Sequence, residues 1–112
     1  MQKASLLENR NFNEDKVAVN VLLKTDYSSE VRILLKKDQI MKEHKAPFPI
    51  VIEIFDGSIE FGVNGESQTL NRGDIISLDA SVPHDLKGIT DSIVRLTIHK
   101  QDTIERINAV VE

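Results

Sequence analysis

The sequence predicts a single all-β domain, folded as a sandwich or a closed barrel. Apolar and polar residues alternate with a period near two from Val17 to Ile98, which is typical of half-buried strands and not of helices. Turn-forming residues interrupt this alternation at near-regular intervals and divide it into roughly eight or nine short strands. The chain has 112 residues, the length of one ordinary domain. We therefore expect one fold with one main site.

Three strands are predicted in the first half of the chain. Their alternating apolar sets are Val17, Val19, Val21 and Leu23, then Val31, Ile33 and Leu35, then the nearly continuous run Ile50–Phe55. Asp56-Gly57 follows the third strand. It predicts a tight hairpin into Ser58–Val63, because such a turn needs the positive φ that glycine adopts without strain.

The second half continues the same pattern. Asn64-Gly65 predicts another hairpin, and Asn71–Asp74 predicts a turn. Four further short strands are expected at Glu66–Leu70, Ile75–Leu78, His84–Lys87 and Ser92–Ile98.

The two ends of the chain differ from this pattern. Residues 1–16 are polar with scattered apolar positions and are expected to form an arm or a pairing strand, so the barrel would comprise residues 17–112. Apolar residues recur at helical spacing between Asp102 and Val111. They indicate a short helix capped by Asp102 or Thr103, with an edge strand as the alternative.

Composition narrows the classes of partner. The net charge is −4, and no basic cluster alternates with aromatic residues, so nucleic acid is not an expected partner. The chain has no cysteine, which excludes disulfides and thiolate metal sites. No apolar run approaches the roughly 20 residues needed to cross a bilayer. A soluble, cytoplasmic protein with no membrane partner is expected.

The most informative stretch is Thr69–His84. It contains a glycine turn, a short apolar strand and a proline bend that ends at His84. Pro83 fixes its own φ and favours an extended Val82, so His84 is held at a defined place after the bend. No Ser-His-Asp arrangement, phosphate-binding glycine loop or dinucleotide motif accompanies it.

Residues 40–98 resemble the two sequence motifs of the cupin superfamily. The first cupin motif has two histidines separated by one residue, then a glutamate, then six residues and a glycine. Counted back from Gly57, these positions hold His44, Ala46 and Ile50. The second motif has a glycine, a proline, a second glycine and a histidine, and here these positions are Gly73, Asp79, Ser81 and His84.

The resemblance implies a jelly-roll barrel with its site between two sheets. In cupins, three imidazoles and a carboxylate usually hold a divalent metal, and this chain retains only His44 and His84 of that set. A metal would need a third ligand, because even catalytic zinc sites usually keep three protein ligands. The candidates for that ligand are Glu43, Glu53, Asp79, Asp85 and His99.

Three interpretations of function remain open. The first is a small-molecule binding or sensing module, with an apolar pocket lined by Ile50, Ile52 and Leu96 and polarised by His44 and His84. The second is a metal-dependent dioxygenase, isomerase or lyase, in which the two histidines and a third ligand would hold iron, manganese, zinc or nickel. The third is a purely structural or partner-binding barrel whose histidines are remnants.

Several residues have both a functional and a structural interpretation. Arg95 could clamp an anionic ligand inside the barrel, or it could lie on the outer sheet face or in a dimer interface. Phe48, between two prolines, could contact a ligand or block edge pairing. His99, at a strand end, is expected to face solvent. The resemblance further implies a homodimer, formed through an outer sheet or an exchanged N-terminal segment.

Overall fold

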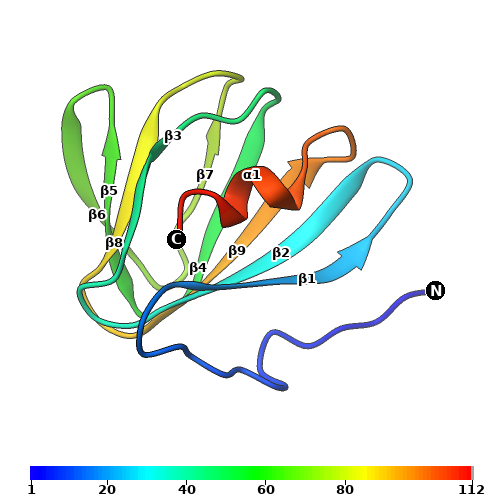
Figure 1. Ribbon diagram of the computed structural model, residues 1–112, viewed down its shortest axis with the longest axis horizontal. Coiled ribbons are helices and arrows are strands. Elements are labelled where there is room, and N and C mark those ends of the chain that lie inside the picture. Colours follow the sequence, from blue (N-terminus) through cyan, green and yellow to red (C-terminus); the bar gives the residue numbers. More distant parts are fainter. Residues whose placement is uncertain (112) are drawn as a thin grey trace.

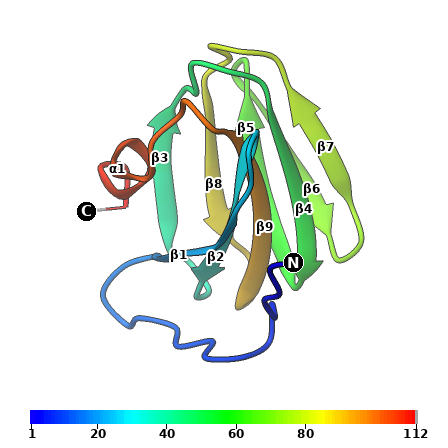
Figure 2. The ribbon, with the colours of Figure 1, turned by 90° about the vertical axis from the view of Figure 1, so that its right-hand side faces the viewer.

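A computed structural model describes residues 1–111 as two antiparallel β-sheets that face each other, with one short helix at their side (Figures 1 and 2). The five-stranded sheet has the order β1 (Ala18–Lys24), β2 (Ser28–Leu35), β9 (Ser92–His99), β4 (Ile50–Asp56) and β7 (Ile75–Leu78). The four-stranded sheet has the order β3 (Ile40–His44), β8 (His84–Gly88), β5 (Ser58–Val63) and β6 (Glu66–Asn71). The prediction of an all-β barrel is confirmed.

An aliphatic core fills the space between the sheets. Ile50, Ile52 and Ile54 alternate inward along β4 and are at most 4% exposed. Phe61 and Leu86 meet them from the other sheet and are also buried. Because alternate side chains of a strand point to opposite faces, the Glu53 side chain lies on the outer face of β4.

The Asn64-Gly65 hairpin is confirmed. Val63 pairs with Glu66, and both residues of the two-residue turn have positive φ, 53° at Asn64 and 77° at Gly65. These are the backbone angles of a type I′ turn, whose twist matches that of the flanking strands.

The predicted hairpin at Asp56-Gly57 is wrong. β4 pairs with β7 and β9, whereas β5 pairs with β6 and β8, so the chain crosses here from one sheet to the other. Gly57 does have positive φ, at 85°, and a Cβ there would lie 2.5 Å from the Asp91 carbonyl oxygen. The dipeptide therefore marks the required backbone angle and a close approach, while β5 continues in the opposite sheet, where Phe61 is buried.

The predicted face of the first strand is also corrected. Val21 pairs with the buried Val31, but after a register shift Leu23 pairs with Glu30, so Leu23 does not share the face of Val21. An extra residue in one strand of a pair turns the following side chains to the other face.

The N-terminal residues 1–16 form no strand and lie along the five-stranded sheet. Arg32, only 3% exposed, donates to the backbone carbonyls of Leu6, Glu8 and Asn9 at 3.2, 2.7 and 3.0 Å. One buried guanidinium thus fixes this segment to its own sheet.

The C-terminal helix is confirmed as α1 (Ile104–Asn108), with Thr103 as its N-cap. The Thr103 hydroxyl accepts a hydrogen bond from the Arg106 amide, as an N-cap side chain does. α1 lies beside β3 and contacts β1 (Figure 2), and Ile107 is its fully buried residue. No helix within residues 1–111 is long and apolar enough to span a membrane.

Candidate functional site

His44 and His84 are direct neighbours across the β3–β8 pair. Their ring centroids lie 4.3 Å apart, with the ring planes tilted by 58°. The pairing passes from Met41 opposite Leu86 to His44 opposite His84, so β3 carries one more residue than β8 in this interval. Met41 and His44 are three positions apart and would otherwise point to opposite faces. The bulge therefore lets both side chains face the barrel interior.

Each imidazole is held by a hydrogen bond to the backbone two residues before it. His44 Nδ1 lies 2.6 Å from the Lys42 carbonyl oxygen, and His84 Nδ1 lies 2.9 Å from that of Val82. A carbonyl oxygen can only accept, so Nδ1 carries the proton in both rings. In the neutral rings, each Nε2 then keeps its lone pair and can accept a hydrogen bond or bind a metal.

Burial keeps both rings neutral. It lowers the pKa of His44 to about 4, although the hydrogen bond to Lys42 opposes this change, while the neighbouring His84 and Arg106 add to it. Burial likewise lowers the pKa of His84, which is 4% exposed and stacks on Phe61 at 5.9 Å. The site therefore offers two hydrogen-bond acceptors near neutral pH.

One small chamber between the sheets brings together every residue that the sequence analysis placed in the binding pocket. These residues are His44, His84, Ile50, Ile52 and Leu96. The chamber has a volume of about 10 Å³, which is room for about one water molecule. Ile107 and Arg106 of α1 complete the lining and close the chamber on the helix side.

Arg106 is the polar lining residue that the sequence analysis missed. Asp102 binds its guanidinium through two hydrogen bonds of 2.7 Å, from Nε and from Nη2. The third nitrogen, Nη1, is buried and has no hydrogen-bond partner among residues 1–111. The spacing of four residues between Asp102 and Arg106 could have indicated an ion pair, but the sequence does not show that α1 packs against the histidines.

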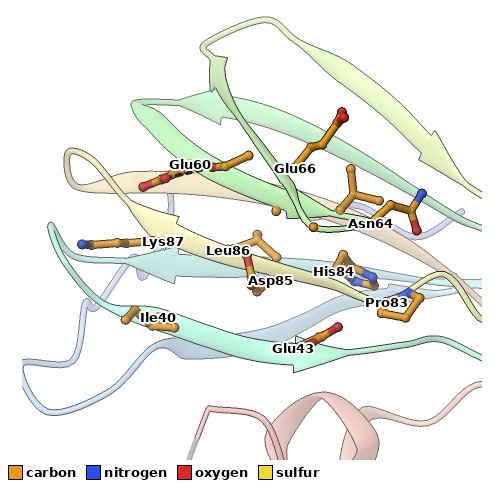
Figure 3. Close-up of a pocket in the computed structure, with 14 residues that line it drawn as sticks. Ile40, Glu43, Glu60, Asn64, Glu66, Pro83, His84, Asp85, Leu86 and Lys87 are labelled. Atoms are coloured by element: carbon orange, nitrogen blue, oxygen red, sulfur yellow. Dashed lines mark hydrogen bonds between the residues drawn. The ribbon is translucent and has the colours of Figure 1, made fainter.

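None of the five candidates for a third metal ligand lines this chamber. Glu43 and Asp85 lie on the outer face of the four-stranded sheet, in an open concavity where Glu60 and Glu66 project from other strands (Figure 3). Glu53 lies on the opposite outer face and accepts a hydrogen bond from Arg95 Nε at 2.7 Å.

The remaining two candidates are outside the chamber as well. Asp79 is exposed after β7. His99 is half-buried and not fully solvated as expected, because its ring stacks on Phe48 at 4.2 Å with the planes 15° apart. Arg95 takes the outer-face alternative and also donates to Glu30 at 2.8 Å.

The donor set does not fit a divalent metal. Two imidazoles face the chamber, and within residues 1–111 no group of three histidine or acidic side chains could hold an ion. Metal sites of this kind usually have at least three protein ligands. Arg106 lines the same chamber, but it is paired with Asp102 and has only donor atoms, so it supplies no metal ligand.

Comparison with known proteins places this arrangement within a structural class. No protein-family model matches the chain, and no curated protein matches it. Among solved structures, an RmlC-like cupin protein from Desulfovibrio desulfuricans is 23% identical at a TM-score of 0.79, over 88% of this chain and 96% of that one. A cupin superfamily protein from Desulfitobacterium hafniense is 12% identical at a TM-score of 0.74, over 87% and 97%.

An enzyme is also among the similar structures. Salicylate 1,2-dioxygenase from Pseudaminobacter salicylatoxidans is 17% identical at a TM-score of 0.69, over 72% of this chain and 25% of that one. At such identities the likeness establishes the fold. The chain is thus a small barrel with the cupin fold, and its interior carries two histidines and an arginine.

Proposed function

We propose that this protein is a small-molecule binding or sensing module whose ligand enters the barrel interior at His44 and His84. The supporting observation is the pair of imidazoles with centroids 4.3 Å apart, each fixed through Nδ1, which leaves Nε2 as the acceptor of each ring. Ile50, Ile52 and Leu96 supply the apolar wall that such pockets generally have. We also propose that this protein acts in the cytoplasm.

The test combines thermal shift with histidine variants. A panel of small carboxylates and phenols is added to the native protein, to His44→Asn and to His84→Asn. Asparagine keeps a side-chain amide that can donate near the Nδ1 position and removes Nε2. His99→Asn is the matched control, because His99 stacks on Phe48 outside the chamber.

We expect at least one panel compound to raise the Tm of the native protein and of His99→Asn but not of the two chamber variants. Ligand binding to the folded state raises apparent stability by mass action. The absence of any histidine-dependent rise across the panel would count against the proposal.

A metal-dependent enzyme is the rival hypothesis: two imidazoles line one chamber, but within residues 1–111 no third ligand joins them. Its test is elemental analysis of protein prepared without a histidine tag in medium containing iron, manganese, zinc and nickel. Near-stoichiometric metal that is lost in the double variant His44→Asn, His84→Asn would support the enzyme. Folded native protein with no such metal would support the binding module.

A further inference from the structure

We propose that Arg106 recognises a carboxylate, so that the chamber binds a small hydroxycarboxylate. This inference rests on the proposed function and assigns the ligand class to the same site. Its starting point is the buried Nη1 of Arg106, which has no hydrogen-bond partner among residues 1–111. Buried polar atoms are nearly always paired, and a charged donor is especially costly to leave unpaired.

The orientation of Arg106 is fixed before any ligand arrives. Asp102 is 8% exposed and holds both Nε and Nη2 at 2.7 Å. A guanidinium is planar, so using the edge formed by Nε and Nη2 leaves Nη1 pointing away from Asp102. Charge-assisted hydrogen bonds to carboxylates are stronger than neutral ones, and a fixed donor loses little entropy on binding.

The two histidines define the rest of the ligand. Their Nε2 atoms accept hydrogen bonds, because each Nδ1 already donates to a backbone carbonyl. A carboxylate oxygen facing Nε2 would place two lone pairs against each other. A ligand that suits all three side chains therefore has an anionic oxygen for Arg106 and a hydroxyl that donates to His44 or His84.

The size of the chamber limits how the ligand is held. A volume of about 10 Å³ admits one oxygen-sized group. A polar group of the small acid would therefore occupy the chamber, and the rest of the acid would need space on the side formed by α1. Asp102 and Arg106 both belong to the segment after β9. A shift of that segment would carry both residues, so entry of the ligand would not require the ion pair to break.

Three probes of similar size separate the parts of this proposal. Lactate carries both the charge and the hydroxyl, propionate lacks the hydroxyl, and methyl lactate lacks the charge. Binding is followed by NMR of the ¹⁵N-labelled histidine rings and arginine side chains. We expect lactate to shift signals of His44, His84 and Arg106, and to bind at least tenfold more tightly than either analogue.

Variants assign the charge to one arginine. Arg106→Gln should weaken lactate binding at least tenfold, and Arg95→Gln, which changes an arginine on the outer face, should leave it unchanged. Arg106→Gln leaves the Asp102 carboxylate buried without its ionic partner, which could destabilise the fold. The double variant Asp102→Asn, Arg106→Gln removes both charges and so avoids this problem. It should fold and show the same loss of lactate binding.

The outcomes distinguish this inference from the proposed function. Equal binding of lactate and methyl lactate, or lactate binding that survives loss of Arg106, would overturn the carboxylate assignment while leaving a histidine-dependent binding site. The absence of any lactate-induced shift would overturn it too. If in addition no carboxylate or phenol moved the His44 and His84 signals, the proposed function would fail with it.

Discussion

Truncating Ile107 to alanine tests whether α1 closes the barrel as a packed element. Ile107 is 1% exposed, belongs to the main core and lines the chamber beside the histidines. The substitution removes three carbon atoms from a filled site. Such core truncations cost about 2–5 kcal/mol in free energy of unfolding, and the cost is smaller where neighbours relax into the space.

We expect Ile107→Ala to cost about 2–3 kcal/mol, near the lower end of that range. α1 has five residues and lies at the side of the barrel, so it can settle toward the new space, and alanine is the better helix former by a few tenths of a kcal/mol. For a domain of this size the loss lowers Tm by roughly 8–15 °C.

The assay is urea unfolding followed by far-ultraviolet circular dichroism, because the chain has no tryptophan to report on folding. Ile89→Ala is the control with the same chemical change, since Ile89 is 40% exposed in a loop, and it should stay within about 0.5 kcal/mol of the native protein. A loss below about 1 kcal/mol for Ile107→Ala would refute the packing of α1 against the core.

Three further predictions follow from single features of the structure, and a fourth, the oligomeric state, follows from the resemblance to the cupin superfamily. Burial lowers the folded-state pKa of His44 to about 4, so the unfolded chain binds more protons between about pH 6.5 and pH 4, and stability should fall across that window as pH falls. Because the ring is only half-buried, the loss attributable to it is discounted to about 1–2 kcal/mol, and a pH series of urea midpoints that is identical for the native protein and His44→Asn would contradict this. Ser81 has a φ of 66°, so Ser81→Gly should raise the urea midpoint by an amount equivalent to about 0.5–1 kcal/mol, and a lower midpoint would disprove strain there. Asp102→Asn should lower stability by about 2–4 kcal/mol by leaving the Arg106 guanidinium short of its partner, and a thermal midpoint equal to that of the native protein would show that the pair is not needed. We also expect a homodimer, and light scattering that gives the monomer mass at every concentration would refute it.

Local signals were sufficient to predict most of the strands. Alternation reports which residues share a face, and turn residues such as Asn64-Gly65 fix the backbone angles between neighbouring strands. These local signals do not determine which other strand a given strand pairs with. Asp56-Gly57 has the same turn chemistry but joins two sheets, because β5 finds its partners in β6 and β8. That choice depends on the packing of the whole barrel.

The candidate site was predictable to the extent that it follows from the fold. His44, His84 and Ile50 occupy motif positions, and the structure brings them to one chamber. The bulge in β3 was not visible in the sequence, although it allows both Met41 and His44 to face inward. Arg106 was missed for a different reason. Its contribution depends on where α1 packs, and helical spacing alone does not fix that position.

Arg106 and the residues that differ from the cupin motif have the same effect: each makes the chamber less suited to a cation and more suited to an anionic group. Where a metal-binding cupin has an imidazole and a carboxylate, this chain has Ala46 and Ile50, both at most 4% exposed. Removing a carboxylate from an apolar chamber removes the charge that stabilises a cation. Asp102 balances the charge of the Arg106 guanidinium, but the buried Nη1 remains a donor that suits an anionic oxygen. Two neutral imidazoles are compatible with either charge, so the histidines alone do not decide between a metal and an acid. The buried Nη1 of Arg106, a hydrogen-bond donor, favours an acid over a metal.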